Sequence, residues 1–242
     1  MGFDGSYLII GHRGAAGLVP ENTLPSFARA LELGVDAVEL DIHLCEGRLI
    51  VIHDDTLERT TNGTGTLASQ TLAALRRLDA GQGAQIPLLE EILELLPGQT
   101  GINIELKGPG TALPLAELLR GIPDRDLLVS SFDHDLLDQF HRAAPDIRAA
   151  PLYSRWKGDP ITTASLFGGG FLNLSRKLVT AVRCRAAQAA GLKLLVYTVN
   201  DPQEAQQLYA MGVQGLFTDY PDRIRSVVPA DRAPSQGGTS RL

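Results

Sequence analysis

Short apolar runs alternate with amphipathic stretches along almost the whole chain. Most of the apolar runs lack polar alternation, which is typical of strands buried on both faces. Alternation of such strands with helices is typical of a parallel sheet with crossover helices. The predicted strands are Tyr7–Gly11, Val35–Asp41, Gly101–Leu106, Leu127–Ser131, Ile147–Leu152, Gly170–Leu174, Lys193–Thr198 and Gly215–Thr218.

The amphipathic stretches between these runs predict helices. Gly34, Gly191 and Gly212 follow three of them, as the usual left-handed helix stop. The predicted helices include Thr23–Leu33, Leu88–Leu96, Leu113–Leu119, Leu136–Arg142, Val179–Ala190 and Pro202–Met211. Eight such units of strand and helix favour a single TIM (β/α)8 barrel. The chain length also fits, because such barrels usually have about 250 residues and this chain has 242. A doubly wound open sheet is the alternative.

The regular alternation is interrupted once, after the second strand region. Residues 54–85 contain the polar sequence TTNGTG at 60–65 and a short helix-like stretch, Leu72–Leu78. We interpret 54–85 as a small insertion on the rim of a barrel domain that spans residues 1–228. Residues 229–242 are rich in Pro, Ser, Gly and Arg, which predicts a disordered tail.

Composition narrows the classes of partner. Apolar residues make up 44% of the chain and charged residues 21%, which is typical of a globular protein. The net charge is −6, and no dense run of Lys or Arg is present, so the sequence argues against nucleic-acid binding and stable membrane association. An anionic substrate would need a few placed cations or a metal.

Cysteine usage and the first residues bear on the compartment. Cys45 and Cys184 are far apart and have no partner motif, which argues against a disulfide framework. The first residues lack a signal-peptide pattern, and no apolar stretch approaches the ~18 residues of a membrane span. We therefore expect a cytoplasmic enzyme.

Three carboxylates are expected at one end of the barrel. Glu39 and Asp41 in VDAVELDIHL are two residues apart and share one face of a buried strand. Glu105 in INIELK, with Lys107, ends the next barrel strand. Carboxylate oxygens suit a hard divalent cation, Mg²⁺ or Ca²⁺. The alternative is a salt-bridge network of these acids with Arg13 and Lys107.

Two histidines follow strands near these acids. His12 and Arg13 come directly after the first strand, and His53 ends the run RLIVIHDD, which predicts an extra strand beside the second one. Histidine has an ordinary pKa of about 6.5 and suits acid–base catalysis at neutral pH. The planar guanidinium of Arg matches phosphate oxygens. Together these residues indicate phosphoryl chemistry.

Other polar residues near strand ends are interpreted as structural. His134 and His141 are expected on a helix. His43 extends the register of Glu39 and Asp41, but the strand is expected to end there and turn through Cys45, Glu46 and Gly47. Turn and helix-cap roles are expected for Asn200, Asp201 and Asp219.

The ordered motifs of the chain resemble those of the glycerophosphodiester phosphodiesterase family. They run from about Ile10 to Pro221 and comprise HRGAAGLVPENTLPSFARAL, GVDAVELDIHL, VIHDDTLERTTNGTG, INIELK, SSF, VYTVN and LFTDYPD. The HRG…PENT block, the E-x-D pair and the HDD…R-T-T block are specific in combination. The resemblance implies metal-dependent hydrolysis of diesters such as glycerophosphocholine and glycerophosphoethanolamine to glycerol 3-phosphate and an alcohol.

Site roles follow from the same resemblance. It implies that Glu39, Asp41 and Glu105 hold one divalent cation, that Arg13 and Lys107 bind phosphate oxygens, and that His12 and His53 are the general base and acid, in an order left open. The implied reaction is attack by the glycerol 2-hydroxyl on phosphorus, followed by opening of a cyclic phosphate by water. The residues implied in these roles and in the glycerol pocket are His12, His53, Glu39, Asp41, Glu105, Arg13, Lys107, Phe132 and Tyr197.

Two departures from the family pattern concern the pocket. Tyr197 stands where relatives often have Trp before T-V-N, and the turn at residues 45–47 is shorter than usual. Tyr197 and Phe132 would supply the apolar wall of the glycerol pocket, although an aromatic residue at a strand end also suits the core. The implied partner is a small phosphodiester bound by a monomer or homodimer.

Three rival functions share the same fold. The nearest is a lysophospholipase D or phospholipase C-like enzyme, which should need an apolar or basic element facing a membrane. The others are a non-catalytic phosphate-binding barrel, and a sugar-phosphate isomerase or aldolase, for which the histidine pair would have no purpose.

Overall fold

Apolar runs of the sequence form one sheet in the computed structural model, which describes residues 2–122, 124–168 and 170–228. The tail predicted at 229–242 lies outside the described residues. Within them the sheet has nine strands in the order β1-β9-β8-β7-β6-β5-β4-β2-β3, and β1 also pairs with β2. The strands are β1 (Leu8–Gly11), β2 (Ala37–Cys45), β3 (Arg48–Val51), β4 (Gly101–Leu106), β5 (Leu127–Ser131), β6 (Arg148–Tyr153), β7 (Phe171–Ser175), β8 (Lys193–Tyr197) and β9 (Gly215–Thr218).

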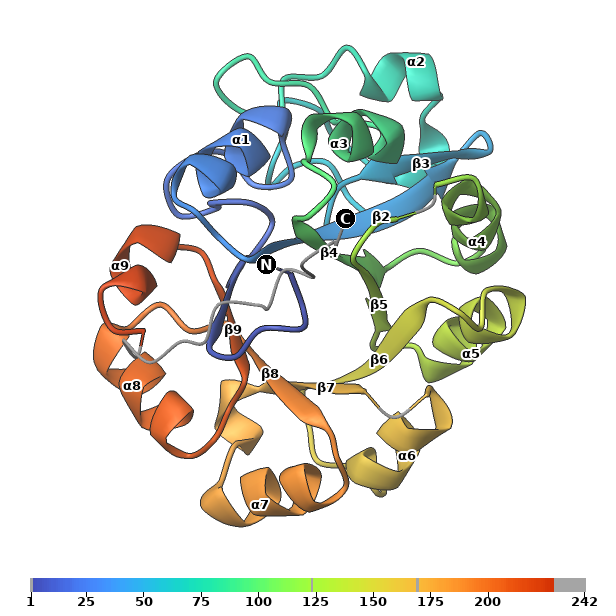
Figure 1. Ribbon diagram of the computed structural model, residues 1–242. Coiled ribbons are helices and arrows are strands. Elements are labelled where there is room, and N and C mark those ends of the chain that lie inside the picture. Colours follow the sequence, from blue (N-terminus) through green and yellow to red (C-terminus); the bar gives the residue numbers. More distant parts are fainter. Residues whose placement is uncertain (1, 123, 169, 229–242) are drawn as a thin grey trace, which may run out of the picture.

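The β1–β2 pairing closes the sheet into a barrel (Figure 1). All pairs in the ring are parallel, whereas β3 pairs antiparallel with β2 and lies outside the ring. The predicted TIM barrel is therefore confirmed, and the open sheet is excluded. Parallel strands place all their carboxyl ends at one mouth, where (β/α)8 enzymes carry their active sites.

Helices surround the barrel and pack on its outer face (Figure 1). Side-chain caps start several of them, such as Thr23 before α1 and Asp159 before α6. The helices are α1 (Leu24–Glu32), α2 (Leu72–Leu75), α3 (Leu89–Leu95), α4 (Ala112–Arg120), α5 (His134–Ala143), α6 (Pro160–Leu166), α7 (Ala181–Ala189), α8 (Pro202–Ala210) and α9 (Pro221–Arg225), with 3-10 turns at Leu67–Ser69 and Arg176–Leu178. The sequence analysis did not predict α6 and α9.

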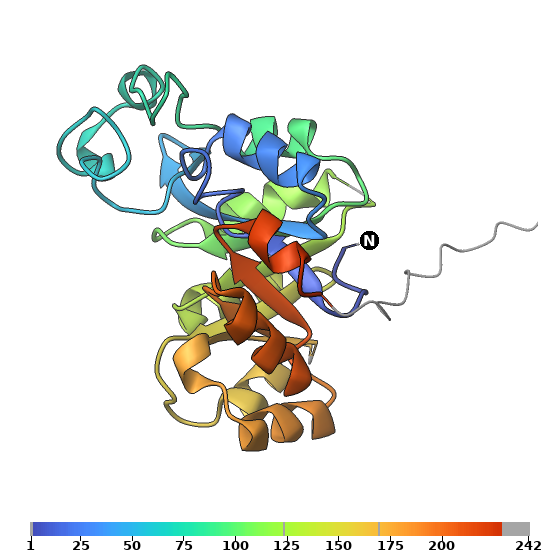
Figure 2. The same ribbon diagram turned by 90° about the vertical axis from the view of Figure 1, so that its left-hand side faces the viewer.

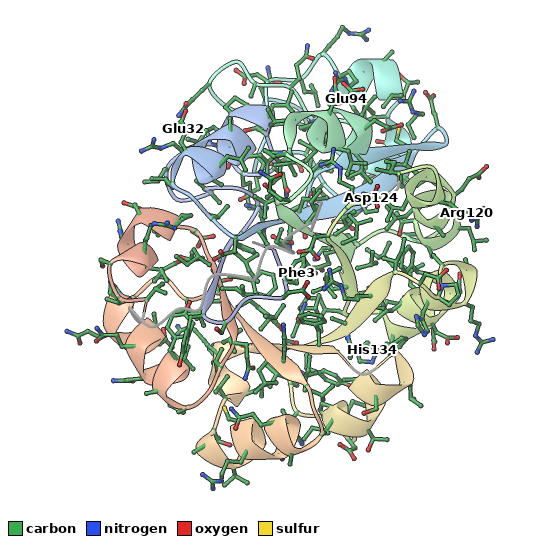
Figure 3. The ribbon with its side chains drawn as sticks, in the orientation of Figure 1. Phe3, Glu32, Glu94, Arg120, Asp124 and His134 are labelled. Atoms are coloured by element: carbon green, nitrogen blue, oxygen red, sulfur yellow. The ribbon has the colours of Figure 1, made fainter. Side chains whose placement is uncertain are left out.

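The strand residues that face the barrel interior form a separate apolar cluster. Phe3 belongs to it and closes the end of the barrel opposite the mouth; Figure 3 shows it at the centre of the ring, with Glu32 and Arg120 on outer helices. Its ring contacts Phe171 edge-on, at a centroid distance of 5.8 Å. The cluster comprises Phe3, Leu8, Ile10, Ala37, Leu128, Ala150, Phe171, Leu195 and Phe217.

The segment between β3 and α3 projects beyond the barrel, on the side away from the N-terminus (Figure 2). It has an apolar core of its own, which includes Leu57, Leu67, Leu75 and Ile86. α2 ends at Leu75, before Leu78, where the helix-like pattern of the sequence ends. The same cluster includes Cys45 of β2 and Ile50 of β3, so it also joins the segment to these strands.

The second strand is longer than predicted. β2 continues past Asp41 to Cys45, because Ile42 to Cys45 pair with β3 in an antiparallel hairpin. His43 is therefore a strand residue and does not start the turn. In the described ranges, no helix has the length and apolarity required to span a membrane.

Candidate active site

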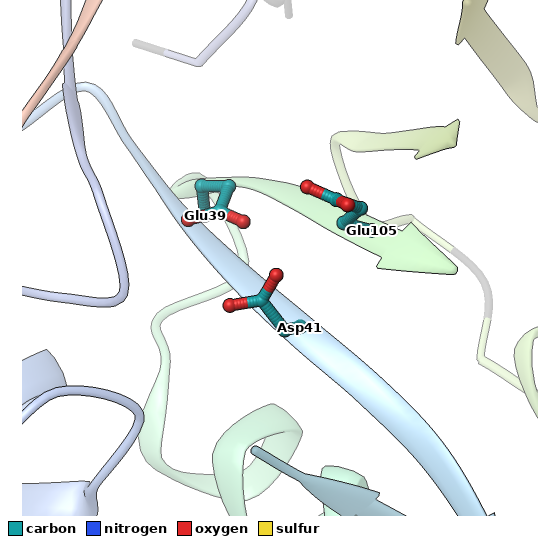
Figure 4. Close-up of side chains that lie close together, drawn as sticks. All are labelled: Glu39, Asp41 and Glu105. Carbon is teal, nitrogen blue, oxygen red and sulfur yellow. The ribbon is translucent and has the colours of Figure 1, made fainter. Parts of the chain in front are cut away.

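Three carboxylates meet inside the mouth of the barrel. Glu39 and Asp41 lie on β2 and Glu105 on β4, and the strand register sets Asp41 beside Glu105. Each offers an oxygen within 4.8 Å of the others (Figure 4). Their exposed fractions are 3%, 1% and 8%. The predicted acidic cluster is thus present, and it could hold a metal ion.

Burial and mutual repulsion make this cluster costly without a cation. Burial, followed by Asp41 and Glu105, raises the pKa of Glu39 well above its usual value. Burial and Asp41 raise the pKa of Glu105 to about 7. Oδ1 of Asp41 is buried and accepts no hydrogen bond from the described residues. A positive ion between the three groups would reverse each of these penalties.

Arg13 lies beside the cluster in a left-handed backbone conformation, with φ of +52°. Its backbone N–H donates to Glu39 Oε2 at 2.9 Å. Its guanidinium contacts Asp41 through Nε at 3.2 Å and donates to Glu21 at 2.7 Å. Asn22, also at positive φ, donates to Asp41 at 2.9 Å. The β1–α1 loop thus supplies the acidic cluster with hydrogen-bond donors and with one positive charge, the Arg13 guanidinium.

Lys107 lies on the other side of the cluster. Its Nζ is 2.9 Å from Glu105 and 4.0 Å from Asp41. Burial disfavours its positive charge, but these two carboxylates outweigh burial and raise the pKa of Lys107 above its usual value. The ammonium also lies 5.7 Å from the ring centre of Phe132 and 3.1 Å from His53 Nε2. Lys107 therefore links the acids to a histidine and to the pocket wall.

His12 is oriented by residues from the ends of β8 and β9. Its Nδ1 lies 2.6 Å from Asp219 Oδ1, and Asn200 donates to the other Asp219 oxygen at 2.6 Å. Burial raises the pKa of Asp219, but the hydrogen bonds from His12 and Asn200 outweigh it, and the net pKa lies below the usual value. His12 Nε2 then faces Glu39, 3.9 Å away.

His53 is oriented by the segment that projects from the barrel. A lysine ammonium can only donate, so His53 Nε2 accepts from Lys107, and Nδ1 carries a hydrogen that it donates to Asp54 at 2.5 Å. Arg59 holds Asp54 through two hydrogen bonds of 2.5 and 3.0 Å, and holds Glu21 through two of 2.8 Å. Burial, above all, lowers the pKa of His53. The neutral imidazole is thus favoured at neutral pH.

These contacts form a closed ring, which we call the charge ring. It connects the acidic cluster, the β1–α1 loop, the projecting segment and one histidine. In order its members are Asp41, Arg13, Glu21, Arg59, Asp54, His53 and Lys107, and Lys107 closes the ring at 4.0 Å from Asp41 and also pairs with Glu105.

A cavity of about 160 Å³ opens between the two histidines. One side is charged and the other is mostly apolar, with Phe132 and Tyr197 stacked edge-on at 5.8 Å. A larger open groove of about 500 Å³ beside the projecting segment contains neither histidine. The lining residues of the smaller cavity are His12, Arg13, Glu39, His53, Asn103, Glu105, Phe132, Leu152, Tyr197, Thr198 and Phe217.

The predicted site residues therefore come together, although Asp41 and Lys107 are not among the residues that line the cavity. Phe132 is 43% exposed at the mouth, so it is not a core residue. His43 turns away from the cavity and contacts the backbone oxygen of His53 at 3.1 Å. His134 contacts the backbone oxygen of Leu152 at 3.2 Å.

Two groups of site residues were not predicted. The cap role was right for Asp201, which starts α8, but wrong for Asn200 and Asp219, which hold His12. The sequence analysis assigned no role to the partners of the charge ring. The signal for them was their place in the quoted motifs, as the Glu of PENT, the first Asp of HDD and the Arg of R-T-T. These partners are Glu21, Asp54 and Arg59.

Comparison with known proteins decides the family. The model of the glycerophosphoryl diester phosphodiesterase family matches residues 12–223. The chain belongs to this family. It is 37% identical to a glycerophosphodiester phosphodiesterase of Bacillus altitudinis, with 89% of this chain and 95% of the relative covered. It is 34% identical to one of Caldanaerobacter subterraneus, with 91% and 97% covered.

A solved structure of a similar protein agrees with the fold. It is a phosphodiesterase of Oleispira antarctica in complex with its product sn-glycerol-3-phosphate. The TM-score is 0.87 at 32% identity, with 92% of this chain and 97% of that chain covered. The family indicated by the motifs is therefore confirmed, and with it the phosphoric diester hydrolase class.

Proposed function

We propose that this family member hydrolyses glycerophosphodiesters such as glycerophosphocholine and glycerophosphoethanolamine to glycerol 3-phosphate and a free alcohol. The observation that carries the proposal is the cavity itself. It places two histidines with opposite charged surroundings beside three buried carboxylates, in a volume of about 160 Å³ that suits a small substrate. The product bound in the Oleispira relative is of the same chemical kind.

Glu39, Asp41 and Glu105 would hold one divalent cation. The donor set contains only oxygen, which favours Mg²⁺ or Ca²⁺, and Oδ1 of Asp41 accepts no hydrogen bond within the described structure. When bound, the cation would neutralise phosphate oxygens and stabilise the charge that develops at phosphorus. Arg13 and Lys107 would add positive charge from the two sides of the cluster.

The surroundings of the histidines suggest their division of labour. His53 is the general base, because its Nε2 is an acceptor and burial keeps the ring neutral. We assign His12 as the general acid: Asp219 accepts from Nδ1–H, and Nε2, which faces the cavity, would carry the transferred proton when the ring is an imidazolium. His53 takes the proton of the glycerol 2-hydroxyl while its oxygen attacks phosphorus, and His12 gives a proton to the leaving alcohol. Water then opens the cyclic phosphate with the two roles exchanged.

An assay of glycerol 3-phosphate release from glycerophosphocholine tests this function. We expect release by the wild type, loss of release in EDTA with recovery on adding Mg²⁺ or Ca²⁺, and loss in His12→Ala and His53→Ala. His141→Ala is a matched control, since His141 lies on α5 and away from the cavity. Full activity in EDTA would refute the cation site.

The order of acid and base can be tested with the leaving group. A 4-nitrophenyl diester of glycerol phosphate releases a stable anion that needs no proton. We expect His12→Ala to release 4-nitrophenol from this ester at a rate near that of the wild type, with the cyclic phosphate accumulating, and to lose activity on glycerophosphocholine. His53→Ala should lose activity on both substrates. The reverse pattern would exchange the roles of the two residues.

A lipid substrate is the weaker alternative. The relatives at 34% and 37% identity both carry the name glycerophosphodiester phosphodiesterase. The cavity is also small. Assay of a lysophospholipid beside glycerophosphocholine separates the two functions directly.

A further inference from the structure

The apolar side of the cavity contains one polar atom with nothing to bind. Phe132, Leu152 and Phe217 contribute carbon to this side, and Tyr197 contributes a ring with a hydroxyl. That hydroxyl is buried and has no hydrogen-bond partner among the described residues. A buried hydroxyl without a partner is costly, which suggests that a ligand completes it.

The ring of Tyr197 is held in place. It packs edge-on against Phe132 at 5.8 Å and against Phe217 at 6.4 Å. Burial, followed by Glu105, raises the pKa of Tyr197 above its usual value, so the hydroxyl keeps its proton and can both donate and accept. The hydroxyl therefore stays inside the cavity as a neutral hydrogen-bonding group.

Asn103 offers a second open polar atom to the same cavity. Its Nδ2 donates to Ser130 at 3.0 Å, which fixes the orientation of the carboxamide. Its Oδ1 is buried and accepts no hydrogen bond from the described residues. The residue is 1% exposed, so this acceptor is available only to a molecule within the cavity. The cavity thus has an open donor–acceptor and an open acceptor besides its charged groups.

Both residues line the same cavity, so a hydroxyl of the proposed substrate is the chemical group that suits these two atoms, and this step rests on the proposed function. Glycerol bound through phosphate has two hydroxyls, and the 2-hydroxyl is the attacking group. The terminal hydroxyl is left without a partner. We propose that Tyr197 Oη and Asn103 Oδ1 bind this terminal hydroxyl and so restrict the enzyme to diesters whose glycerol is not acylated or alkylated there.

Two kinds of modified substrate, one without the terminal hydroxyl and one acylated there, should be disfavoured for physical reasons. A substrate with the hydroxyl satisfies the two buried polar atoms, whereas a deoxy substrate leaves them unpaired in a closed space. An acyl chain at the same oxygen removes the hydrogen that Asn103 Oδ1 would accept. Tyr197 is then a specificity determinant and not only part of an apolar wall.

The test compares two substrates that both keep the attacking 2-hydroxyl. They are glycerophosphocholine and the phosphocholine diester of propane-1,2-diol, which lacks only the terminal hydroxyl. The wild type should prefer glycerophosphocholine in kcat/KM by about tenfold or more. Tyr197→Phe should lose about tenfold on glycerophosphocholine and change little on the propanediol diester. Asn103→Ala should act in the same direction.

Tyr209→Phe is the matched control. Its hydroxyl donates to the backbone of Leu8 at 3.1 Å and does not line the cavity, so this variant should keep the substrate preference of the wild type. If Tyr197→Phe slows both diesters equally, or neither, the inference is wrong although the proposed function stands. If the wild type releases no glycerol 3-phosphate from glycerophosphocholine, the proposed function itself fails.

Discussion

Arg59 provides a sharp test of the charge ring, because it lies outside the cavity and yet holds the partner of a catalytic histidine. Its guanidinium makes four hydrogen bonds of 2.5 to 3.0 Å, two with Asp54 and two with Glu21. Asp54 in turn holds His53 Nδ1. The change Arg59→Gln removes the charge and most of these bonds while leaving every cavity residue in place.

The expected magnitudes differ for stability and activity. The Arg59 side chain is 46% exposed, so solvent screens its ion pairs, and we expect a loss of about 1 kcal/mol in the free energy of unfolding. The loss of kcat should be about tenfold, because Asp54 would no longer fix the orientation of His53. A structural role alone predicts the first effect without the second.

The pH profile of kcat/KM tests the effect of Arg59→Gln in an independent way. Hydrogen bonds from Arg59, more than any other cause, lower the pKa of Asp54. Without this cation the negative charge of Asp54 acts more fully on His53 and should raise the pKa of the imidazole. A general base must be deprotonated, so the acidic limb of kcat/KM should move to higher pH in Arg59→Gln.

Arg76→Gln is a matched control in the same projecting segment. Arg76 pairs with Glu91 through two hydrogen bonds of 2.7 and 2.6 Å, far from the cavity residues. Its loss should cost similar stability and leave kcat and the pH profile of glycerophosphocholine hydrolysis unchanged. Equal losses of kcat in both variants, or a wild-type kcat and acidic limb in Arg59→Gln, would refute the proposed role of the charge ring.

Three further predictions concern other parts of the molecule. Phe3→Ala should lower the free energy of unfolding in urea by about 3 to 5 kcal/mol. It should leave kcat intact, because the ring lies at the end of the barrel opposite the cavity. A large loss of kcat would contradict the separation of Phe3 from the active site. Because the pKa of Glu105 rises from 4.5 to about 7 on folding, the metal-free protein should lose stability as pH rises between these values. Bound Mg²⁺ or Ca²⁺ and the change Glu105→Gln should each reduce this pH dependence of stability, which thermal melts at pH 5 and 8 measure. Asn200→Ala should lower kcat severalfold by releasing Asp219 from one side, which steady-state kinetics would show or disprove.

The barrel could be predicted because its signal is local. Each strand buried on both faces is an apolar run, and each run ends where the chain turns into a helix. α6 and α9 escaped prediction because they are short and begin with Pro160 and Pro221, so neither presents a long amphipathic pattern. The extension of β2 to Cys45 depends on pairing with β3, a contact that residue types alone do not specify.

The acidic cluster could also be predicted from the sequence, because Glu39 and Asp41 are two residues apart and therefore lie on one face of a strand. The partners of the histidines were not. Asp219 lies 207 positions from His12, and Arg59 lies 38 positions from Glu21, so only the closed barrel brings them together. Acidic residues after strands also suit helix caps, and that is the role Asp201 has.

The energetics of the two ends of the barrel explain why the site needs supports from outside it. The interior cluster around Phe3 stabilises one end through apolar burial. At the mouth, Glu39 and Glu105 are buried at a cost that their raised pKa values reflect. Packing cannot hold His53 there, because its neighbours are charged and partly exposed. The charge ring fixes it instead, through Arg59 of a segment with its own apolar core. The position of His53 therefore depends on the projecting segment, through Asp54 and Arg59, as well as on Lys107 after β4.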